Sequence, residues 1–160
     1  MTTPDIELVR RLLLAAALGA ALGIERELRQ KSAGLRTNIL IAVGSALFTI
    51  MSIEMAAPGA DPGRIAAQIV TGIGFLGAGA IMRTNGGVQG LTTAATVWVN
   101  AAVGVAAGGG RYHLALIATG ITISVLLVLV PIERLIERFS ARSGLAAIDK
   151  EPGGGPPTAS

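Results

Sequence analysis

A glycine pattern at residues 72–77 is the motif in this sequence with the most specific chemical meaning. Gly72, Gly74 and Gly77 follow the G-x-G-x-x-G spacing with which a strand-to-helix turn holds the pyrophosphate of a dinucleotide. Such a site also needs an acidic residue about 20 positions later. Here the next acid is Glu133, more than fifty residues further on. The sequence therefore argues against a nucleotide site.

The same glycines have a simpler interpretation as contacts between membrane helices. Gly74 and Ala78 are four residues apart, and this spacing recurs in two other apolar segments. Small residues at this spacing let neighbouring helix backbones approach closely. The glycines predicted to lie at such contacts are Gly19, Gly23, Gly72, Gly74, Gly77, Gly104 and Gly108.

A few polar side chains lie inside the apolar segments, where an unpaired amide is costly. The most polar of them are Asn38, Gln68 and Asn100. We favour hydrogen bonds between helices for these side chains. A narrow polar path or substrate pocket is the alternative, with Gln68 and Asn100 as its best candidates.

The densest group of charges lies between residues 25 and 37, directly after the first apolar segment. If the segments cross a membrane alternately, Glu25, Arg26 and Arg36 face the same side as the end of the third segment and the start of the fourth. Two helix N-termini there add free N–H groups and partial positive charge. An anion or an acidic partner is therefore one candidate ligand, and the other residues predicted at this side are Arg83, Thr92 and Thr93.

The sequence offers little for metal binding, catalysis or nucleic-acid recognition. It has no cysteine and one histidine, His113, and no carboxylate lies between Asp61 and Glu133. A magnesium site or a proton relay would need such groups. Aromatic residues are only 3% of the chain and the basic residues are not clustered, which disfavours nucleic acid. We expect no enzyme activity, no cofactor and no bound metal.

Composition places these residues in a membrane protein. Of the 160 residues, 51% are hydrophobic and 14% are charged, whereas soluble domains carry about 25% charged residues. We predict an all-α, polytopic membrane helix bundle of about five transmembrane helices. The expected spans are residues 6–24, 38–56, 65–82, 92–108 and 112–130. Thr37 or Asn38 is expected to cap the second, and Thr92 or Thr93 the fourth.

Positive charges predict the orientation of the bundle. With residues 25–37 in the cytoplasm, nine lysines and arginines lie on that side and four on the other. This arrangement puts the N-terminus outside and the C-terminus inside. Arg10 and Arg11, in the first helix, are expected to reach outward to the interface, and we favour a retained helix over a cleaved signal peptide.

Pro131 is expected to end the last span. Ile132, Leu135, Ile136 and Phe139 then recur at helical spacing, which predicts a short amphipathic helix at the cytoplasmic surface. The domains predicted are residues 1–131 (transmembrane), 132–148 (amphipathic helix) and 149–160 (disordered tail).

Three ordered blocks resemble one bacterial family. They are Ala33-Gly34-Leu35-Arg36-Thr37-Asn38, the run from Arg64 to Gly79, and Gly90-Leu91-Thr92-Thr93-Ala94-Ala95-Thr96-Val97-Trp98. Together they closely resemble the MgtC/SapB family of inner-membrane proteins, over about residues 8–130. The resemblance implies a multi-pass inner-membrane protein linked to growth under magnesium limitation and, in pathogens, to virulence. Virulence-associated members tend to have Asn where this chain has Thr92.

The resemblance implies modulation of another membrane protein or of ion homeostasis more than direct transport. We therefore expect a non-enzymatic regulator in contact with membrane lipid, forming a homodimer or binding another, unknown membrane protein. The alternative is a small transporter or channel for Mg²⁺ or another ion.

Overall fold

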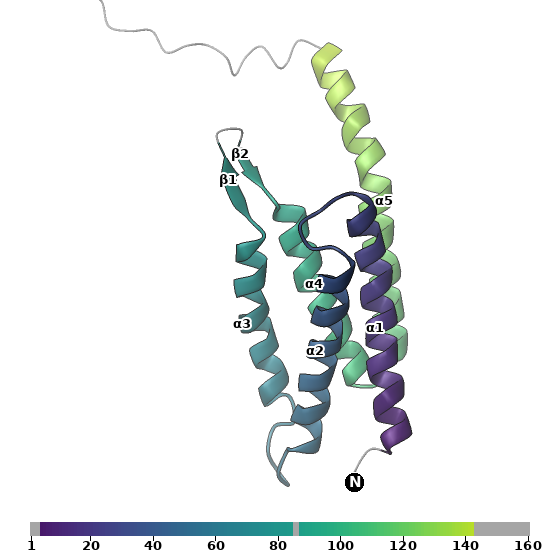
Figure 1. Ribbon diagram of the computed structural model, residues 1–160, viewed down its shortest axis with the longest axis vertical. Coiled ribbons are helices and arrows are strands. Elements are labelled where there is room, and N and C mark those ends of the chain that lie inside the picture. Colours follow the sequence, from purple (N-terminus) through teal and green to yellow (C-terminus); the bar gives the residue numbers. More distant parts are fainter. Residues whose placement is uncertain (1–3, 85–86, 143–160) are drawn as a thin grey trace, which may run out of the picture. The chain divides into compact units, whose positions relative to one another are not determined.

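The computed structural model describes residues 4–84 and 87–142, and it is built almost entirely of helices (Figure 1). The helices are α1 (Asp5–Leu28), α2 (Leu35–Glu54), α3 (Arg64–Gly79), α4 (Leu91–Gly108) and α5 (Tyr112–Arg142). Strands β1 (Met82–Thr84) and β2 (Gly87–Gln89) form a small antiparallel hairpin between α3 and α4. Residues 1–123 make one compact unit, and residues 124–160 belong to a second.

In the first unit, α2 and α4 lie between α1 and α3 (Figure 1). One core cluster joins α1, α2, α4 and the start of α5 through small side chains, including Ala15, Ala42 and Ala107. A second joins α2, α3 and α4 around Ile41, Ile73 and Val97. Helix α3 is the loosely held member, because among its residues only Ile73 and Gly77 are buried.

Three helical segments are long and apolar enough to cross a membrane: Leu35–Glu54, Leu91–Gly108 and Tyr112–Ile132. Helix α3 is also apolar but has 16 residues, about 24 Å at 1.5 Å per residue against a hydrocarbon core of about 30 Å. Helix α1 has 24 residues, but it carries charges at both ends. The all-helical, membrane-type architecture is confirmed, whereas a count of five spans stays a prediction.

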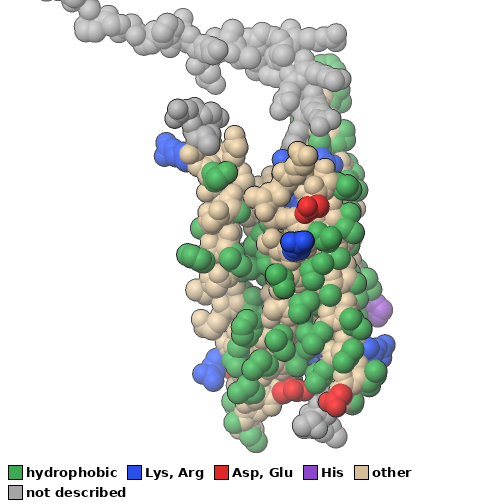
Figure 2. Space-filling model, viewed as in Figure 1, with side chains coloured by type: hydrophobic (Ala, Val, Ile, Leu, Met, Phe, Trp, Pro, Cys, Tyr) green, Lys and Arg blue, Asp and Glu red, His purple; other side chains and the backbone are tan. Residues whose placement is uncertain are grey.

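Apolar side chains cover much of the visible outer face of α1–α4, and most of the charged ones lie toward the two ends (Figure 2). Large hydrophobic residues are exposed on every helix, among them Leu40 at 71% and Phe75 at 83%. In water such a surface would drive aggregation, whereas in a bilayer it faces acyl chains of similar polarity.

The predicted helix caps are wrong. Helix α2 starts after Gly34 and α4 after Gly90, and neither cap position contributes a side-chain hydrogen bond. Gly90 has φ of 89°, and a Cβ there would collide with the carbonyl of Ala80. Glycine is needed at this position because the hairpin returns to α4 directly beside the end of α3.

Two predicted helix ends are also wrong. The third helix ends at Gly79 rather than at residue 82, because Met82 pairs with Gln89 in the hairpin. The last helix does not end at Pro131 but continues to Arg142. Proline removes one N–H donor, yet its φ is compatible with a helix, and in lipid no other structure satisfies the surrounding backbone. Residues 143–160, which include the predicted tail, lie outside the described residues.

Candidate functional site

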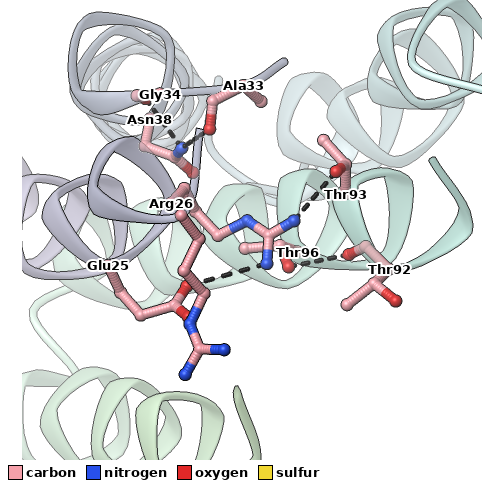
Figure 3. A network of polar contacts seen from close by, with 9 residues as sticks. Glu25, Arg26, Ala33, Gly34, Asn38, Thr92, Thr93 and Thr96 are labelled. Carbon is pink, nitrogen blue, oxygen red and sulfur yellow. Dashed lines mark hydrogen bonds and ion pairs between the residues drawn. The ribbon is translucent and has the colours of Figure 1, made fainter. Parts of the chain in front are cut away.

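The buried polar residues gather where α1 ends and where α2 and α4 begin. Arg26, at the end of α1, is 2% exposed, and its guanidinium extends to α4 (Figure 3). Its Nη2 donates a hydrogen bond of 2.8 Å to Oγ1 of Thr93, which is 3% exposed. The end of α1 and the start of α4, which were predicted to lie at the same side, are therefore in direct contact through these side chains.

Glu25 supplies the negative charge of this cluster. It is 8% exposed, its Oε2 lies 3.6 Å from Nη1 of Arg26, and its Oε1 is paired with Arg29. One buried carboxylate thus faces two guanidinium groups, which leaves the cluster with an excess positive charge. Nε of Arg26 has no hydrogen-bond partner among the described residues.

The start of α2 is tied to α1 by an acid rather than by its own cap. Oε2 of Glu27 accepts a 2.9 Å hydrogen bond from the backbone N–H of Leu35. This contact satisfies one of the free donors at a helix N-terminus, and its negative charge suits the helix dipole there.

Deeper in the bundle, two amides join α2 to α4. Nδ2 of Asn38 donates to the carbonyls of Ala33 (2.8 Å) and Gly34 (2.9 Å), which holds the turn before α2. Nδ2 of Asn100 donates to the carbonyl oxygen (2.7 Å) and to Oδ1 (3.1 Å) of Asn38. Both side chains are fully buried, and Oδ1 of Asn100 has no partner within the described chain.

Four of the predicted contact glycines lie where backbones approach closely. A Cβ at Gly19 would lie 2.7 Å from the carbonyl oxygen of Asn38, and one at Gly23 would lie 2.8 Å from Cα of Leu35. In the same way, added Cβ atoms at Gly104 and Gly108 would meet α2, at 2.8 Å from Cβ of Ser45 and from Cα of Ala46 respectively. These distances leave no room for a side chain between α1, α2 and α4.

The α3 glycines behave differently from this prediction. A Cβ at Gly77 would make an ordinary contact of 3.8 Å with Ala94. At Gly72 and Gly74 a Cβ would meet no atom of the described chain within 4 Å. The close helix contact predicted for these two glycines is therefore not made within this chain, because α3 lies at the edge of the bundle.

The structure leaves four predicted site residues outside the buried cluster. Arg36, Gln68, Arg83 and Thr92 are all exposed. Only the backbone of Thr92 joins the network, by accepting a 2.8 Å hydrogen bond from Oγ1 of Thr96. Gln68 lines a groove between α2 and α3, and the hydrogen bonds of Asn100 go to Asn38 instead.

The opposite end of the bundle contains contacts that the sequence did not suggest. Arg11 does not simply reach outward: its Nη1 donates a 2.9 Å hydrogen bond to the carbonyl of Gly108 at the end of α4, and its Nε pairs with Glu7. Tyr112 also donates to Glu7. The only available signal was Arg11 itself, since a cation can bind the free carbonyls at a helix C-terminus.

Ser52, near the end of α2, joins α2 to the start of α3. Its Oγ donates to the carbonyl of Pro62 (2.6 Å) and accepts from the N–H groups of Ile65 (3.1 Å) and Ala66 (3.3 Å). It thereby caps the start of α3 from the end of α2, a contact between segments that periodicity cannot reveal.

For metals, the described residues contain no group of three or more His, Cys, Asp or Glu side chains that could hold an ion. The chemistry available in the buried cluster is therefore that of paired charges and amides.

Comparison with known proteins decides the family. The model of the MgtC family matches residues 12–135. The chain belongs to the MgtC family. No solved structure matches it.

Its MgtC relatives are similar over most of this chain. An Escherichia coli K12 protein named "Putative magnesium transporter YhiD" is 49% identical over 127 residues, covering 75% of this chain and 59% of the relative. Protein MgtC of Salmonella typhimurium LT2 is 54% identical over 111 residues, covering 69% and 47%. Protein MgtC of Brucella abortus is 47% identical over 130 residues, covering 81% and 54%. The chain thus spans about half the length of these relatives.

Proposed function

We propose that this chain is a non-enzymatic, multi-pass protein of the bacterial inner membrane that modulates another membrane protein in magnesium homeostasis. Its relatives carry the names MgtC and magnesium transporter, which supports the magnesium context. In this proposal the N-terminus lies outside the cell, and the end of the bundle with Arg26 and Arg36 faces the cytoplasm. A homodimer or a complex with another membrane protein is the form expected to act.

The observation that carries the proposal is the closed packing between α1, α2 and α4. Asn100 and Asn38 bind each other, Arg26 binds Thr93, and carbonyls of α2 occupy the space beside Gly104 and Gly108. A permeating ion would have to replace its water shell with protein oxygens along a path. Since the polar groups here are used for helix pairing, this interior supports a role in contacts rather than in conduction.

The proposal is tested by measuring bacterial growth and Mg²⁺ flux through the purified chain. In a strain lacking its own MgtC-family gene, the wild-type chain should restore growth at low Mg²⁺. Vesicles containing the purified chain and a Mg²⁺-sensitive dye should show no flux above that of protein-free vesicles. Restored growth without flux is the expected result. Growth that is not restored would count against a role in magnesium homeostasis.

The second candidate is a small ion transporter, and one observation favours it. Gln68 is exposed on α3 and has no hydrogen-bond partner among the described residues, so its amide faces a groove at membrane depth. If transport is correct, vesicles will show Mg²⁺ flux and Gln68→Leu will abolish it. That result would overturn the regulator proposal.

A further inference from the structure

A groove between α2 and α3 is a feature of the bundle that the buried cluster does not use. It encloses about 580 Å³. Its walls are mainly apolar, and its lining includes Leu40, Ile41, Phe48, Ile69, Ile73 and Leu76. Gly44 and Gly72 also line it, and a Cβ on either would meet nothing within 4 Å in the described chain. We refer to it as the α2–α3 groove.

The length of the α2–α3 groove suits a single acyl chain better than a membrane-spanning helix. It runs along α3 from Ile65 to Leu76, which is roughly 16 Å at 1.5 Å per residue. This length is about half of the ~30 Å hydrocarbon core, the depth of one leaflet.

Two exposed arginines lie at the end of the bundle where the lining of the groove stops. Its lining ends at Thr37 and Leu76, where α2 begins and where α3 leads into the hairpin (Figure 1). Arg36 adjoins Thr37, and Arg83 lies on β1. Both are exposed, and neither side chain forms an ion pair or hydrogen bond within the described residues.

Glu27 is an exposed acid near the start of α2. It accepts the N–H of Leu35 and forms no ion pair with Arg36 or Arg83. The first turn of α2 adds partial positive charge of its own. An apolar channel about one leaflet deep, with two exposed arginines at the end of the bundle where its lining stops, matches an acyl chain joined to an anionic headgroup.

We propose that the α2–α3 groove binds one phospholipid with an anionic headgroup, with an acyl chain over Gly44 and Gly72 and the phosphate at Arg36 and Arg83. The headgroup then lies on the side of the membrane that carries more lysine and arginine, where anionic lipids also attract basic residues. This inference needs only the membrane location of the chain, and it stands or falls separately from the proposed regulatory function.

Lipid binding to the purified wild-type protein in detergent, measured by native mass spectrometry, tests the site. Titration with phosphatidylglycerol should give one tightly held lipid, and phosphatidylcholine should bind more weakly. Replacing either Arg36 or Arg83 by glutamine should lower the affinity for phosphatidylglycerol by about fivefold, because one basic residue near an anionic surface contributes roughly that factor. The double variant, Arg36→Gln with Arg83→Gln, should bind both lipids equally.

The groove itself is tested by filling it. Gly72→Leu should lower the affinity for phosphatidylglycerol by roughly tenfold or more. The leucine side chain would displace part of the acyl chain, and each methylene removed from an apolar site lowers affinity severalfold. Gly74→Leu is the matched control, because Gly74 is on the same helix and equally open but does not line the groove. Gly44→Leu fills the groove from α2 and serves if Gly72→Leu does not fold.

Two results would overturn the assignment. The first is a wild-type protein that holds phosphatidylcholine as tightly as phosphatidylglycerol. The second is equal retention of phosphatidylglycerol by the groove-filling variant and by Gly74→Leu, whether both keep it or both lose it.

Discussion

Asn38 and Asn100 place two amides in a part of the core that water does not reach. Asn100 donates twice to Asn38, and Asn38 in turn holds the turn at Ala33 and Gly34. A chain of hydrogen bonds therefore runs from α4 through α2 to the loop after α1. In a bilayer each such contact contributes about 0.6–2 kcal/mol, and it also fixes which residues of α2 and α4 face each other.

Asn100→Ala should lower the free energy of unfolding by about 1–2 kcal/mol, because it removes both hydrogen bonds to Asn38 and leaves the buried Oδ1 of Asn38 without this donor. Unfolding in mixed micelles with increasing denaturing detergent measures this change. Thr92→Ala, at an exposed side chain on the same helix, is the control and should change little. Equal losses in the two variants would contradict the role of the amide pair.

Arg26 and Thr93 are predicted to act as a pair. A double-mutant cycle with Arg26→Gln and Thr93→Val should give a coupling of about 0.5–3 kcal/mol, because the two side chains share a buried hydrogen bond. The same cycle with Thr92→Val in place of Thr93→Val is the control, since Arg26 does not bind the Thr92 side chain. Additive effects in the Arg26–Thr93 cycle would show that this hydrogen bond adds no stability.

Among the elements, α1, α2 and α4 form a tight group and α3 is held loosely beside it. The space around the glycines shows this difference in packing. Gly104 lies against α2 with no room for a methyl group, whereas Gly74 on α3 faces open space in the described chain. A helix that is packed on one side only can bind lipid or another helix on the other.

Gly104→Ala should destabilise the protein, whereas Gly74→Ala should not. The first forces α4 away from Ala42 and Ser45 and should cost about 1–3 kcal/mol. The second should be neutral or stabilise by up to about 1 kcal/mol, since alanine favours a helix and has space here. Thermal unfolding in detergent compares the two, and destabilisation of equal size would contradict the difference in packing.

At the scale of the whole molecule, the loops that join the helices of the first unit lie at two opposite ends of the bundle (Figure 1). The loop after α1 and the β1–β2 hairpin lie at one end, and the loop between α2 and α3 lies at the other (Figure 1). In a membrane-spanning bundle these ends must face opposite compartments. The proposed orientation places the first end in the cytoplasm.

The chain has no natural cysteine, so single cysteines report this arrangement directly. Lys31→Cys and Val88→Cys should be protected from an impermeant thiol reagent in intact cells and become reactive once the membrane is opened. Ala60→Cys, in the loop between α2 and α3, should react in intact cells. The opposite pattern would reverse the orientation, and labelling of all three in intact cells would contradict a spanning bundle.

Composition and periodicity alone determined that this chain is a helical membrane protein, because long apolar segments without acids have few other stable forms. They also predicted close contacts at Gly19, Gly23, Gly104 and Gly108, since small residues four apart lie on one face of a helix.

Only the tertiary structure decided which polar groups pair and which glycines stay open. Arg26 reaches Thr93 across 67 positions and Asn100 reaches Asn38 across 62, and no local pattern specifies a partner at such separations. Gly74 and Gly104 each have a small residue four positions later, yet in the described chain one faces open space and the other faces the backbone of α2. The difference arises because α3 lies at the edge of the bundle and α4 lies at its centre, and the position of a helix depends on contacts with all the others.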